Sequence, residues 1–155
     1  MTIKVALAGA GAFGIKHLDG IQNIDGVEVV SLISRDLAKT QEVADKYGIK
    51  HVTTDLKDSL AIKEVDAVIL CTPTQMHASQ TIACLEAGKH VQVEIPLCDV
   101  LADGEKVVAL QKQTGLVAMC GHTRRFNPSH QYVHQKITAG EFNIQQMDVQ
   151  TYFFR

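Results

Sequence analysis

Short apolar runs alternate along the chain with segments whose apolar residues recur at helical spacing. The runs Ile3–Ala8, Val27–Ile33 and Ala67–Cys71 are rich in valine, isoleucine and leucine, which is typical of parallel strands buried on both faces. Between the first two runs, the segment Phe13–Ile24 places an apolar residue at about every third position. That spacing predicts a helix, so the chain opens with strand, helix and strand.

The same alternation continues through the first 120 residues and predicts six strands. They are expected at Ile3–Ala8, Val27–Ile33, Ile49–Val52, Ala67–Cys71, Val91–Val93 and Leu116–Cys120. The connecting helices are expected at Phe13–Ile24, Leu37–Tyr47, Leu56–Leu60, Ser79–Ala87 and Leu101–Gln113. Strand and helix in regular succession indicate parallel βαβ units with right-handed crossovers, and therefore an α/β fold with an open, doubly wound parallel sheet.

The pattern changes after the sixth strand. The segment HTRRFNPSH is polar and turn-like, and Pro128 stands where the first turn of a helix tolerates proline. The tail Ile144–Arg155 alternates roughly and ends in aromatic residues, which predicts one more strand with no partner in the first sheet. We therefore expect a first domain over residues 1–122. Residues 123–155 are expected to form a linker helix and the first strand of a largely absent second α+β domain.

Composition narrows the class of protein. Hydrophobic residues make up 46% of the 155 residues and charged residues 21%, which argues against disorder. A net charge of −2 gives no electrostatic footprint for nucleic acid. No apolar run is long enough to span a membrane and no signal peptide is visible, so we expect a cytoplasmic protein. The four cysteines form no CxxC and predict reduced thiols.

The first strand runs directly into the sequence GAGAFG, a GxGxxG loop that opens a helix inside a βαβ unit. In this context the loop predicts binding of a dinucleotide. Gly9 permits the tight turn, Gly11 lets a pyrophosphate approach the backbone, and Gly14 lets helix and strand pack closely. The N–H groups of Ala12 and Phe13 are expected to bind the phosphates. A glycine-rich turn without a ligand is the alternative.

The end of the second strand indicates which dinucleotide is used. An NAD enzyme usually places a carboxylate there, whereas this chain has Ser34 and Arg35, whose hydroxyl and guanidinium suit a 2′-phosphate. Asp36 is either a ribose-binding acid shifted by two positions or the N-cap of the next helix, which we favour. The alternative for Arg35 is a solvated loop charge. We therefore predict NADP, with NAD possible.

Polar segments follow the fourth, fifth and sixth strands. They read CTPTQMH, VEIP and GHTRRF, and all three lie at the carboxyl edge of the predicted sheet. Ligands bind at this edge in doubly wound folds. We therefore expect the three segments to share one cofactor and substrate crevice.

At these residues the chain resembles the Gfo/Idh/MocA family of oxidoreductases. The segments that carry the resemblance are GAGAFG, CTPTQMH, AGKHVQVEIP and GHTRRFNP. It implies a Rossmann dinucleotide-binding domain in which Thr72, Pro73 and His77 line the cofactor and Glu94 and Pro96 border its nicotinamide. For His77, capping of the following helix is an equal alternative. The family also implies a second, substrate-binding domain and a homo-oligomer when the protein is full length.

The chain departs from the family at one chemically important position. The family has lysine in the segment Glu-Lys-Pro, where it assists proton transfer, whereas this chain has Ile95. The catalytic group is therefore unknown, with Glu94 and His122 as weak candidates. His122, Thr123 and Arg124 match the segment that faces the substrate, and an arginine there suits a carboxylate.

Longer stretches of similarity narrow the resemblance to one branch of this family. GIKHLDGI, KHVQVEIPL and FNIQQMDVQTYFFR are among them. This branch implies NADP-dependent oxidation of the cyclic hemiacetal of a carboxylated semialdehyde, in the degradation of protocatechuate, to a pyrone dicarboxylate. The alternatives are another dehydrogenase of the family, a nucleotide-binding regulatory protein without catalysis, or an incomplete chain. His130 and His134 have the i, i+4 spacing of zinc ligands, but no third ligand is in view, and no metal is predicted.

Overall fold

The computed structural model describes residues 2–150, which divide into two compact units between Gly121 and His122. The first unit contains the strands β1 (Ile3–Ala8), β2 (Val27–Ile33), β3 (His51–Thr53), β4 (Ala67–Leu70), β5 (His90–Val93) and β6 (Ala118–Cys120). Its helices are α1 (Ala12–Ile21), α2 (Leu37–Tyr47), α3 (Leu56–Leu60), α4 (Thr74–Glu86) and α5 (Leu101–Thr114). Strand and helix alternate throughout, as the hydrophobic pattern predicts.

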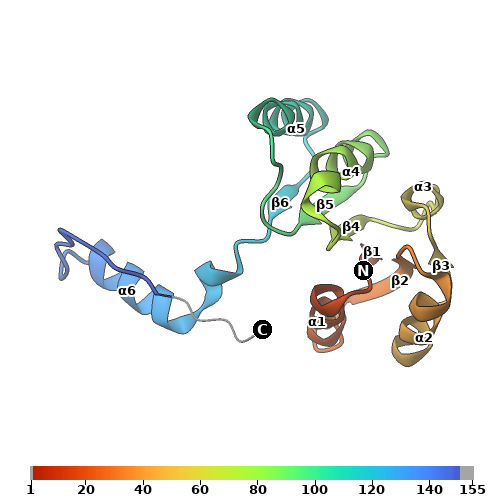
Figure 1. The fold of residues 1–155 in the computed structure, drawn as a ribbon, viewed down its shortest axis with the longest axis horizontal. Coiled ribbons are helices and arrows are strands. Elements are labelled where there is room, and N and C mark those ends of the chain that lie inside the picture. The colour runs from red at the N-terminus through yellow and green to blue at the C-terminus, as the bar shows by residue number, and fades with distance from the viewer. Residues whose placement is uncertain (1, 151–155) are drawn as a thin grey trace. The chain divides into compact units, whose positions relative to one another are not determined.

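All neighbouring strands of the sheet are parallel, in the order β3-β2-β1-β4-β5-β6. Strand order reverses between β1 and β4, and this reversal is the switch point at which doubly wound sheets bind their ligands. Helices α1 and α2 lie on one side of the sheet and α3, α4 and α5 on the other (Figure 1). The predicted doubly wound α/β fold is confirmed.

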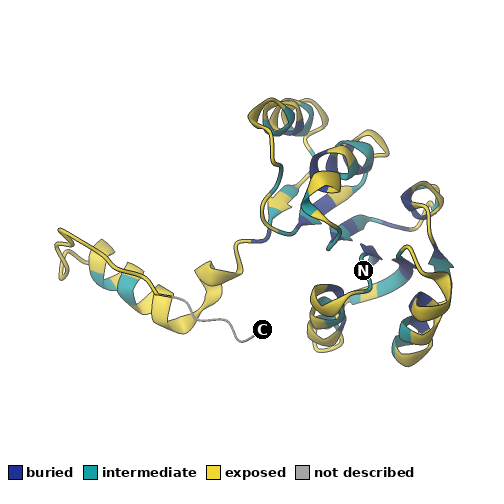
Figure 2. Cartoon of the chain, viewed as in Figure 1, coloured by how far each residue is buried: buried dark blue, intermediate teal, exposed yellow. Residues whose placement is uncertain are grey.

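The sheet has an apolar core on each face because consecutive strand residues point to opposite sides. Leu7 and Leu32 pack with Leu18 of α1 and Ala44 of α2 on one face. Ala6 and Ala8, together with apolar residues of the neighbouring strands, pack with residues of α3 and α4 on the other. The central strands are accordingly the most buried part of this unit (Figure 2).

The predicted bounds differ most from the structure at α4. The helix was expected at Ser79–Ala87, but it begins at Thr74, directly after Pro73. Pro73 is extended, at φ −60° and ψ 143°, and it precedes the helix as its N-cap residue, without a side-chain hydrogen bond. The prediction of the start was wrong because a proline that ends a strand can be followed at once by helix, and no side-chain cap marks the place.

The second unit begins with the 3-10 helix η1 (Thr123–Phe126), followed by α6 (Pro128–Thr138). Asn127 caps α6 by accepting a hydrogen bond from the backbone of Ser129, and proline occupies the first turn as predicted. In the tail, residues 144–150 form no strand, and the remainder of the predicted strand lies outside the described residues. An extended segment needs a neighbouring strand to pair with, and residues 2–150 supply none there. None of the helices in this range is long and apolar enough to cross a membrane.

Candidate functional site

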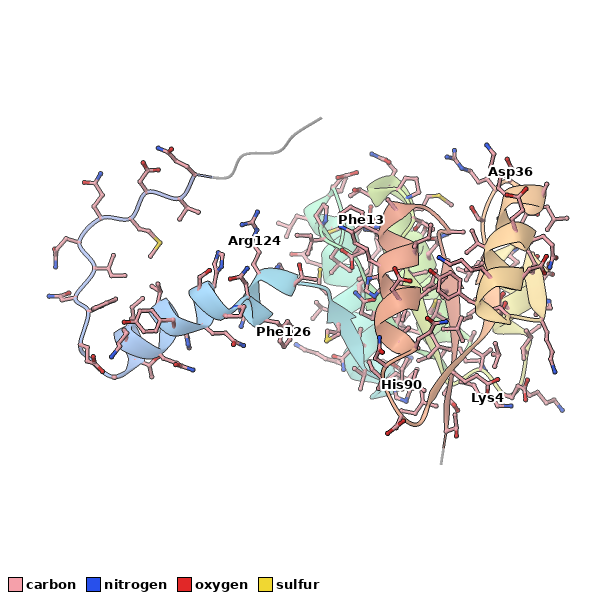
Figure 3. All side chains as sticks on the ribbon, turned by 90° about the horizontal axis from the view of Figure 1, so that it is seen from below. Lys4, Phe13, Asp36, His90, Arg124 and Phe126 are labelled. Carbon is pink, nitrogen blue, oxygen red and sulfur yellow. The ribbon has the colours of Figure 1, made fainter. Side chains whose placement is uncertain are left out.

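The carboxyl ends of the strands form a continuous edge because the residue after each strand bonds to its neighbour. These N–H···O=C bonds run from Gly9 to Ile33 (2.7 Å), Cys71 to Ala8 (2.7 Å), Glu94 to Leu70 (2.9 Å) and Gly121 to Val93 (2.8 Å). Figure 3 shows Phe13 and Asp36 at this end of the first unit and Lys4 and His90 at the opposite end. The segments after β1, β2, β4, β5 and β6 therefore share one edge.

The glycine loop has the geometry that a pyrophosphate site needs. Gly9 has φ +106°, and a Cβ there would collide with the carbonyl oxygen of Cys71. A Cβ on Gly14 would collide with the carbonyl of Gly9, whereas one on Gly11 would meet nothing within 4 Å. Gly9 and Gly14 are thus required by packing, while Gly11 faces open space.

The start of α1 offers unpaired donors beside that space. Gly11 is the N-cap residue, and because glycine has no side chain it makes no capping hydrogen bond to the first turn. Within residues 2–150, the N–H groups of Ala12 and Phe13 have no hydrogen-bond acceptor. Because first-turn N–H groups carry the positive end of the helix dipole, they form a site for an anion.

A cleft of about 420 Å³ joins the glycine loop to the ends of β2 and β4. It is lined by Gly9, Ala10, Gly11, Ile33, Ser34, Arg35, Thr54, Leu56, Cys71, Thr72, Pro73, Met76 and Gln80. The cleft brings together six residues that the sequence predicts for the cofactor: Gly9, Gly11, Ser34, Arg35, Thr72 and Pro73. The lining suits the phosphate and adenosine part of a dinucleotide, whereas Glu94 and Pro96 at the end of β5 are not among the lining residues.

Of the three residues after β2, Asp36 caps a helix, whereas Ser34 and Arg35 face the cleft. Asp36 accepts a hydrogen bond from the backbone N–H of Lys39 at 3.2 Å and caps α2, which confirms the N-cap interpretation. That backbone bond lowers the pKa of Asp36. Ser34 and Arg35 line the cleft, and the guanidinium of Arg35 has no partner within residues 2–150. Arg35 is therefore available to an anionic ligand.

His77 is buried beneath the loops at this edge, with an exposed fraction of 1%. Its Nδ1 is 2.7 Å from the carbonyl oxygen of Pro96 and its Nε2 is 2.7 Å from that of Thr72. Both ring nitrogens are thus engaged by backbone. His77 lies inside α4 and joins the loop after β4 to the loop after β5, so its contacts are structural ones. Its predicted contact with the cofactor stays a prediction.

Glu94, which the sequence singled out, has two polar neighbours, His17 and Cys71, to which the sequence analysis gave no role. Nε2 of His17 is 2.8 Å from Oε1 of Glu94, and the thiol of Cys71 completes a group whose polar atoms lie within 4.8 Å of one another. Burial first, and then the charge of Glu94, raise the pKa of Cys71 to about 12. The thiol therefore stays protonated at neutral pH. His17 stands three residues after the last glycine of the loop, and this spacing is the signal that places it on the sheet-facing side of α1.

The remaining predicted residues are distributed differently. Ile95 is 47% exposed at the end of β5, beside Glu94 and Pro96. His122, Thr123 and Arg124 belong to the second unit, where Arg124 lines a cavity of about 630 Å³. The other lining residues of that cavity are Arg125, His130, Gln131, His134 and Gln135. Among residues 2–150, His130 and His134 belong to no group of three potential metal ligands.

Comparison with known proteins agrees with this geometry. Residues 3–122 match the oxidoreductase family with the NAD-binding Rossmann fold, Gfo/Idh/MocA, and residues 128–155 match the C-terminal region of bacterial oxidoreductases. The chain is 70% identical, over 99% of its length, to the 4-carboxy-2-hydroxymuconate-6-semialdehyde dehydrogenase of Sphingobium sp. strain SYK-6. It is 35% identical to the inositol 2-dehydrogenase of Rhodococcus erythropolis, over 90% of its length.

Solved structures show the same fold. The scyllo-inositol dehydrogenase of Lactobacillus casei, crystallised with NAD(H) and scyllo-inositol, superposes with a TM-score of 0.87 at 28% identity. The match covers 91% of this chain and 42% of that one. The chain spans about half the length of the curated relatives it matches, 49% of the Sphingobium dehydrogenase and 41% of the Rhodococcus enzyme. By its sequence over residues 3–122 and by its fold, the chain belongs to the Gfo/Idh/MocA family of oxidoreductases.

Proposed function

We propose that this chain supplies the dinucleotide-binding half of an NADP-dependent dehydrogenase. Its substrate is the cyclic hemiacetal of 4-carboxy-2-hydroxymuconate-6-semialdehyde, and its product is 2-pyrone-4,6-dicarboxylate, formed during protocatechuate 4,5-cleavage. The observation that carries the proposal is the 70% identity to the Sphingobium dehydrogenase over 99% of the chain. The cleft at the carboxyl edge supports it, because it offers a cofactor site of the expected kind.

The reaction requires two bonds to break at the hemiacetal. The C–H bond gives a hydride and the O–H bond gives a proton, which leaves the carbonyl of the pyrone. The nicotinamide of the bound dinucleotide supplies the hydride acceptor, and the protein supplies position and electrostatics. The tasks of this chain are therefore to hold the dinucleotide extended along the strand ends and to bring the substrate against its nicotinamide end.

We assign the first task to residues at the glycine loop and in the cleft. The first N–H groups of α1, at Ala12 and Phe13, would bind the pyrophosphate, and Gly11 leaves room for it. Ser34 and Arg35 would bind the 2′-phosphate at one end of the cleft. Thr72 and Pro73 line the cleft at the end of β4, on the side toward Glu94 and Pro96. These last residues then border the nicotinamide.

The hydroxyl proton of the hemiacetal must go to a group other than the side chain of Ile95. Ile95 is a hydrocarbon and takes no proton, although it occupies the position of the family's lysine. Glu94 and His122 remain the candidates in this chain. Arg124, with the neighbouring His122 and Thr123, would bind a substrate carboxylate, since a guanidinium binds a carboxylate through two parallel hydrogen bonds.

The test is turnover by the full-length natural protein. We expect absorbance at 340 nm to rise when NADP⁺ and the semialdehyde are mixed with the enzyme, and the pyrone dicarboxylate to appear in equal amount. Inositol with the same cofactor serves as the matched control, because inositol dehydrogenases share the fold. Oxidation of inositol with no turnover of the semialdehyde would contradict the proposal. Size measurement of the same sample tests the expected homo-oligomer, and cell fractionation tests the expected cytoplasmic location.

A second candidate is a nucleotide-binding regulatory protein of this fold without catalysis. The observation that favours it is Ile95 in place of the family's lysine. It predicts saturable binding of NADPH with no turnover of any semialdehyde or sugar by the full-length protein. Turnover of the semialdehyde excludes it.

A further inference from the structure

The His17–Glu94 pair connects two parts of the cofactor site. His17 lies on α1, whose first N–H groups face the phosphate space, and Glu94 follows β5. The two residues are 77 positions apart, yet Nε2 of His17 is 2.8 Å from Oε1 of Glu94. The bond therefore ties the helix that follows the glycine loop to the end of β5, the strand next to β4.

The Glu94 carboxylate is enclosed on several sides. Its side chain is 14% exposed, the thiol of Cys71 lies beside it at the end of β4, and β6 approaches from the other side. A Cβ placed on Gly121 would lie 3.2 Å from Oε1 of Glu94, a tight contact, and 2.5 Å from Nε2 of Gln92, which would have to shift. An enclosed carboxylate is costly unless it accepts hydrogen bonds.

The two oxygens of this carboxylate differ in their partners. Oε1 accepts from His17, because a carboxylate has no proton to give and the imidazole must then donate from Nε2. Oε2 has no partner within residues 2–150. The protonated thiol of Cys71 adds no negative charge beside it. One oxygen is thus fixed by the protein and the other is left to accept from a ligand.

The position of the His17–Glu94 pair in the sheet indicates which half of the dinucleotide Glu94 would contact. The glycine loop follows β1, and the residues for the 2′-phosphate follow β2, on one side of the switch point. Glu94 follows β5, on the other side, beyond β4. A dinucleotide that lies across the switch point with its adenosine over β2 places its nicotinamide half over β4 and β5.

We propose that His17 is a positioning residue for the nicotinamide half of the cofactor. By holding Oε1, His17 fixes Glu94 so that Oε2 accepts a hydrogen bond from a hydroxyl or amide N–H of that half. The proposal rests on the proposed use of NADP. It adds a residue that acts through another and gives His17 no contact with the reacting atoms.

The experiment separates the two halves of the ligand. The dissociation constants of NADPH and of 2′,5′-ADP, which lacks the nicotinamide half, are measured by calorimetry with the full-length protein. The variants are His17→Leu, which removes the donor, and His17→Gln, whose amide N–H takes the place of Nε2. Lys16→Gln is the control, because Lys16 is exposed on the same helix and has no bond to Glu94.

We expect His17→Leu to weaken NADPH about tenfold, the scale of a lost charge-assisted hydrogen bond, and to leave 2′,5′-ADP within about twofold. His17→Gln is expected to recover most of the NADPH affinity, and Lys16→Gln to match the wild type. Glu94→Ala and the double variant His17→Leu/Glu94→Ala should weaken NADPH equally, since His17 acts only through Glu94.

Three results would overturn the proposal. The first is that His17→Leu loses affinity for NADPH and for 2′,5′-ADP equally, and the second is that its NADPH affinity is unchanged. The third is that the double variant binds NADPH more weakly than Glu94→Ala alone. If His17→Leu does not fold, the comparison of Glu94→Ala with His17→Gln still decides, because failure of glutamine to support NADPH binding contradicts it. Failure of the wild type to bind 2′,5′-ADP would instead contradict the use of NADP, and the same variants are then measured with NADH and AMP.

Discussion

At the scale of single residues, we propose that charge at the end of β2 sets the preference between the two dinucleotides. Asp36 directs its carboxylate to the backbone N–H of Lys39, and its role there is that of a helix cap. Arg35 beside it has no partner within the described residues and lines the cleft. The guanidinium of Arg35 is therefore available to bind a ligand, whereas the carboxylate of Asp36 is hydrogen-bonded to the start of α2.

Arg35→Asp is expected to reverse the preference between the two dinucleotides. The change removes an attraction to the 2′-phosphate and adds a repulsion, so NADP should weaken roughly ten- to a hundredfold while NAD changes little. Titration of both dinucleotides at fixed salt measures this. Lys50→Asp makes the same change of charge just before β3, at the opposite edge of the sheet, and should leave both affinities unchanged. Equal NADP affinity in wild type and Arg35→Asp would identify Arg35 as a solvated charge.

Asp36→Ala is expected to lower the melting temperature at pH 7 by removing the cap of α2. The pKa of Asp36 is lowered in the folded protein, so its stabilisation is present above its ordinary value of 3.8 and is lost as pH falls through the folded value. The difference in melting temperature should therefore shrink below that pH. Asp36→Ser keeps a cap without the charge, and its melting temperature should stay close to the wild type at pH 7. A difference that persists in acid would contradict this reason.

The histidines show how far sequence alone can reach at this scale. His17 is hydrogen-bonded to the side chain of Glu94, whereas His77 lies between two backbone carbonyl groups. These different partners come together only in the folded structure. The sequence singled out His77 from its motif and passed over His17. In contrast, the cap role of Asp36 was predictable because its partner lies three residues away in the same helix. Local partners can be found from sequence, and partners 77 residues away cannot.

At the scale of elements, the glycine loop joins β1 to α1 within a very small space. Two of its glycines are required by neighbouring carbonyl groups, Gly9 by that of Cys71 and Gly14 by that of Gly9. Gly11 has no such neighbour. The three glycines of the motif therefore serve two purposes, packing and ligand approach, which substitution can separate.

Gly14→Ala should destabilise folding by about 1–3 kcal/mol, the usual cost of overpacking, because its methyl group collides with rigid backbone. Gly11→Ala should leave stability nearly unchanged and weaken NADPH, because its methyl group enters the space for the pyrophosphate. Urea unfolding and calorimetric titration of both variants measure the two effects. Full NADPH affinity in Gly11→Ala would place the phosphates elsewhere.

The succession of elements was predictable, and some of their bounds were not. The six strands are found near their expected places because runs buried on both faces leave a clear apolar pattern. The early start of α4 was missed, since Thr74–Met76 carries no capping side chain before it. The convergence of Cys71, Glu94 and Gly121 follows from the order of strands in the sheet. That order depends on pairings between distant segments.

At the scale of the whole molecule, the chain carries a cleft at the carboxyl edge of its sheet and spans about half the length of its relatives. We expect the 155-residue chain by itself to bind NADPH but to turn over substrate poorly, because catalysis needs the substrate held against the nicotinamide. Calorimetry and a 340 nm assay on a chain of verified mass, beside the full-length natural protein, make the comparison. Turnover at the full-length rate by the 155-residue chain would contradict this.

The place of β1 in the sheet has a consequence for how the protein is made. Ile3–Ala8 leaves the ribosome before the other strands of its sheet, yet it becomes a central strand, flanked by β2 on one edge and β4 on the other. Once Val27–Ile33 has been synthesised, one edge of β1 can pair. The other stays open until Ala67–Leu70 emerges, and an open apolar edge invites pairing with other nascent chains. A pause in translation between Ile33 and Ala67 would lengthen that exposure, and we expect slow codons in this interval to lower the yield of folded chain.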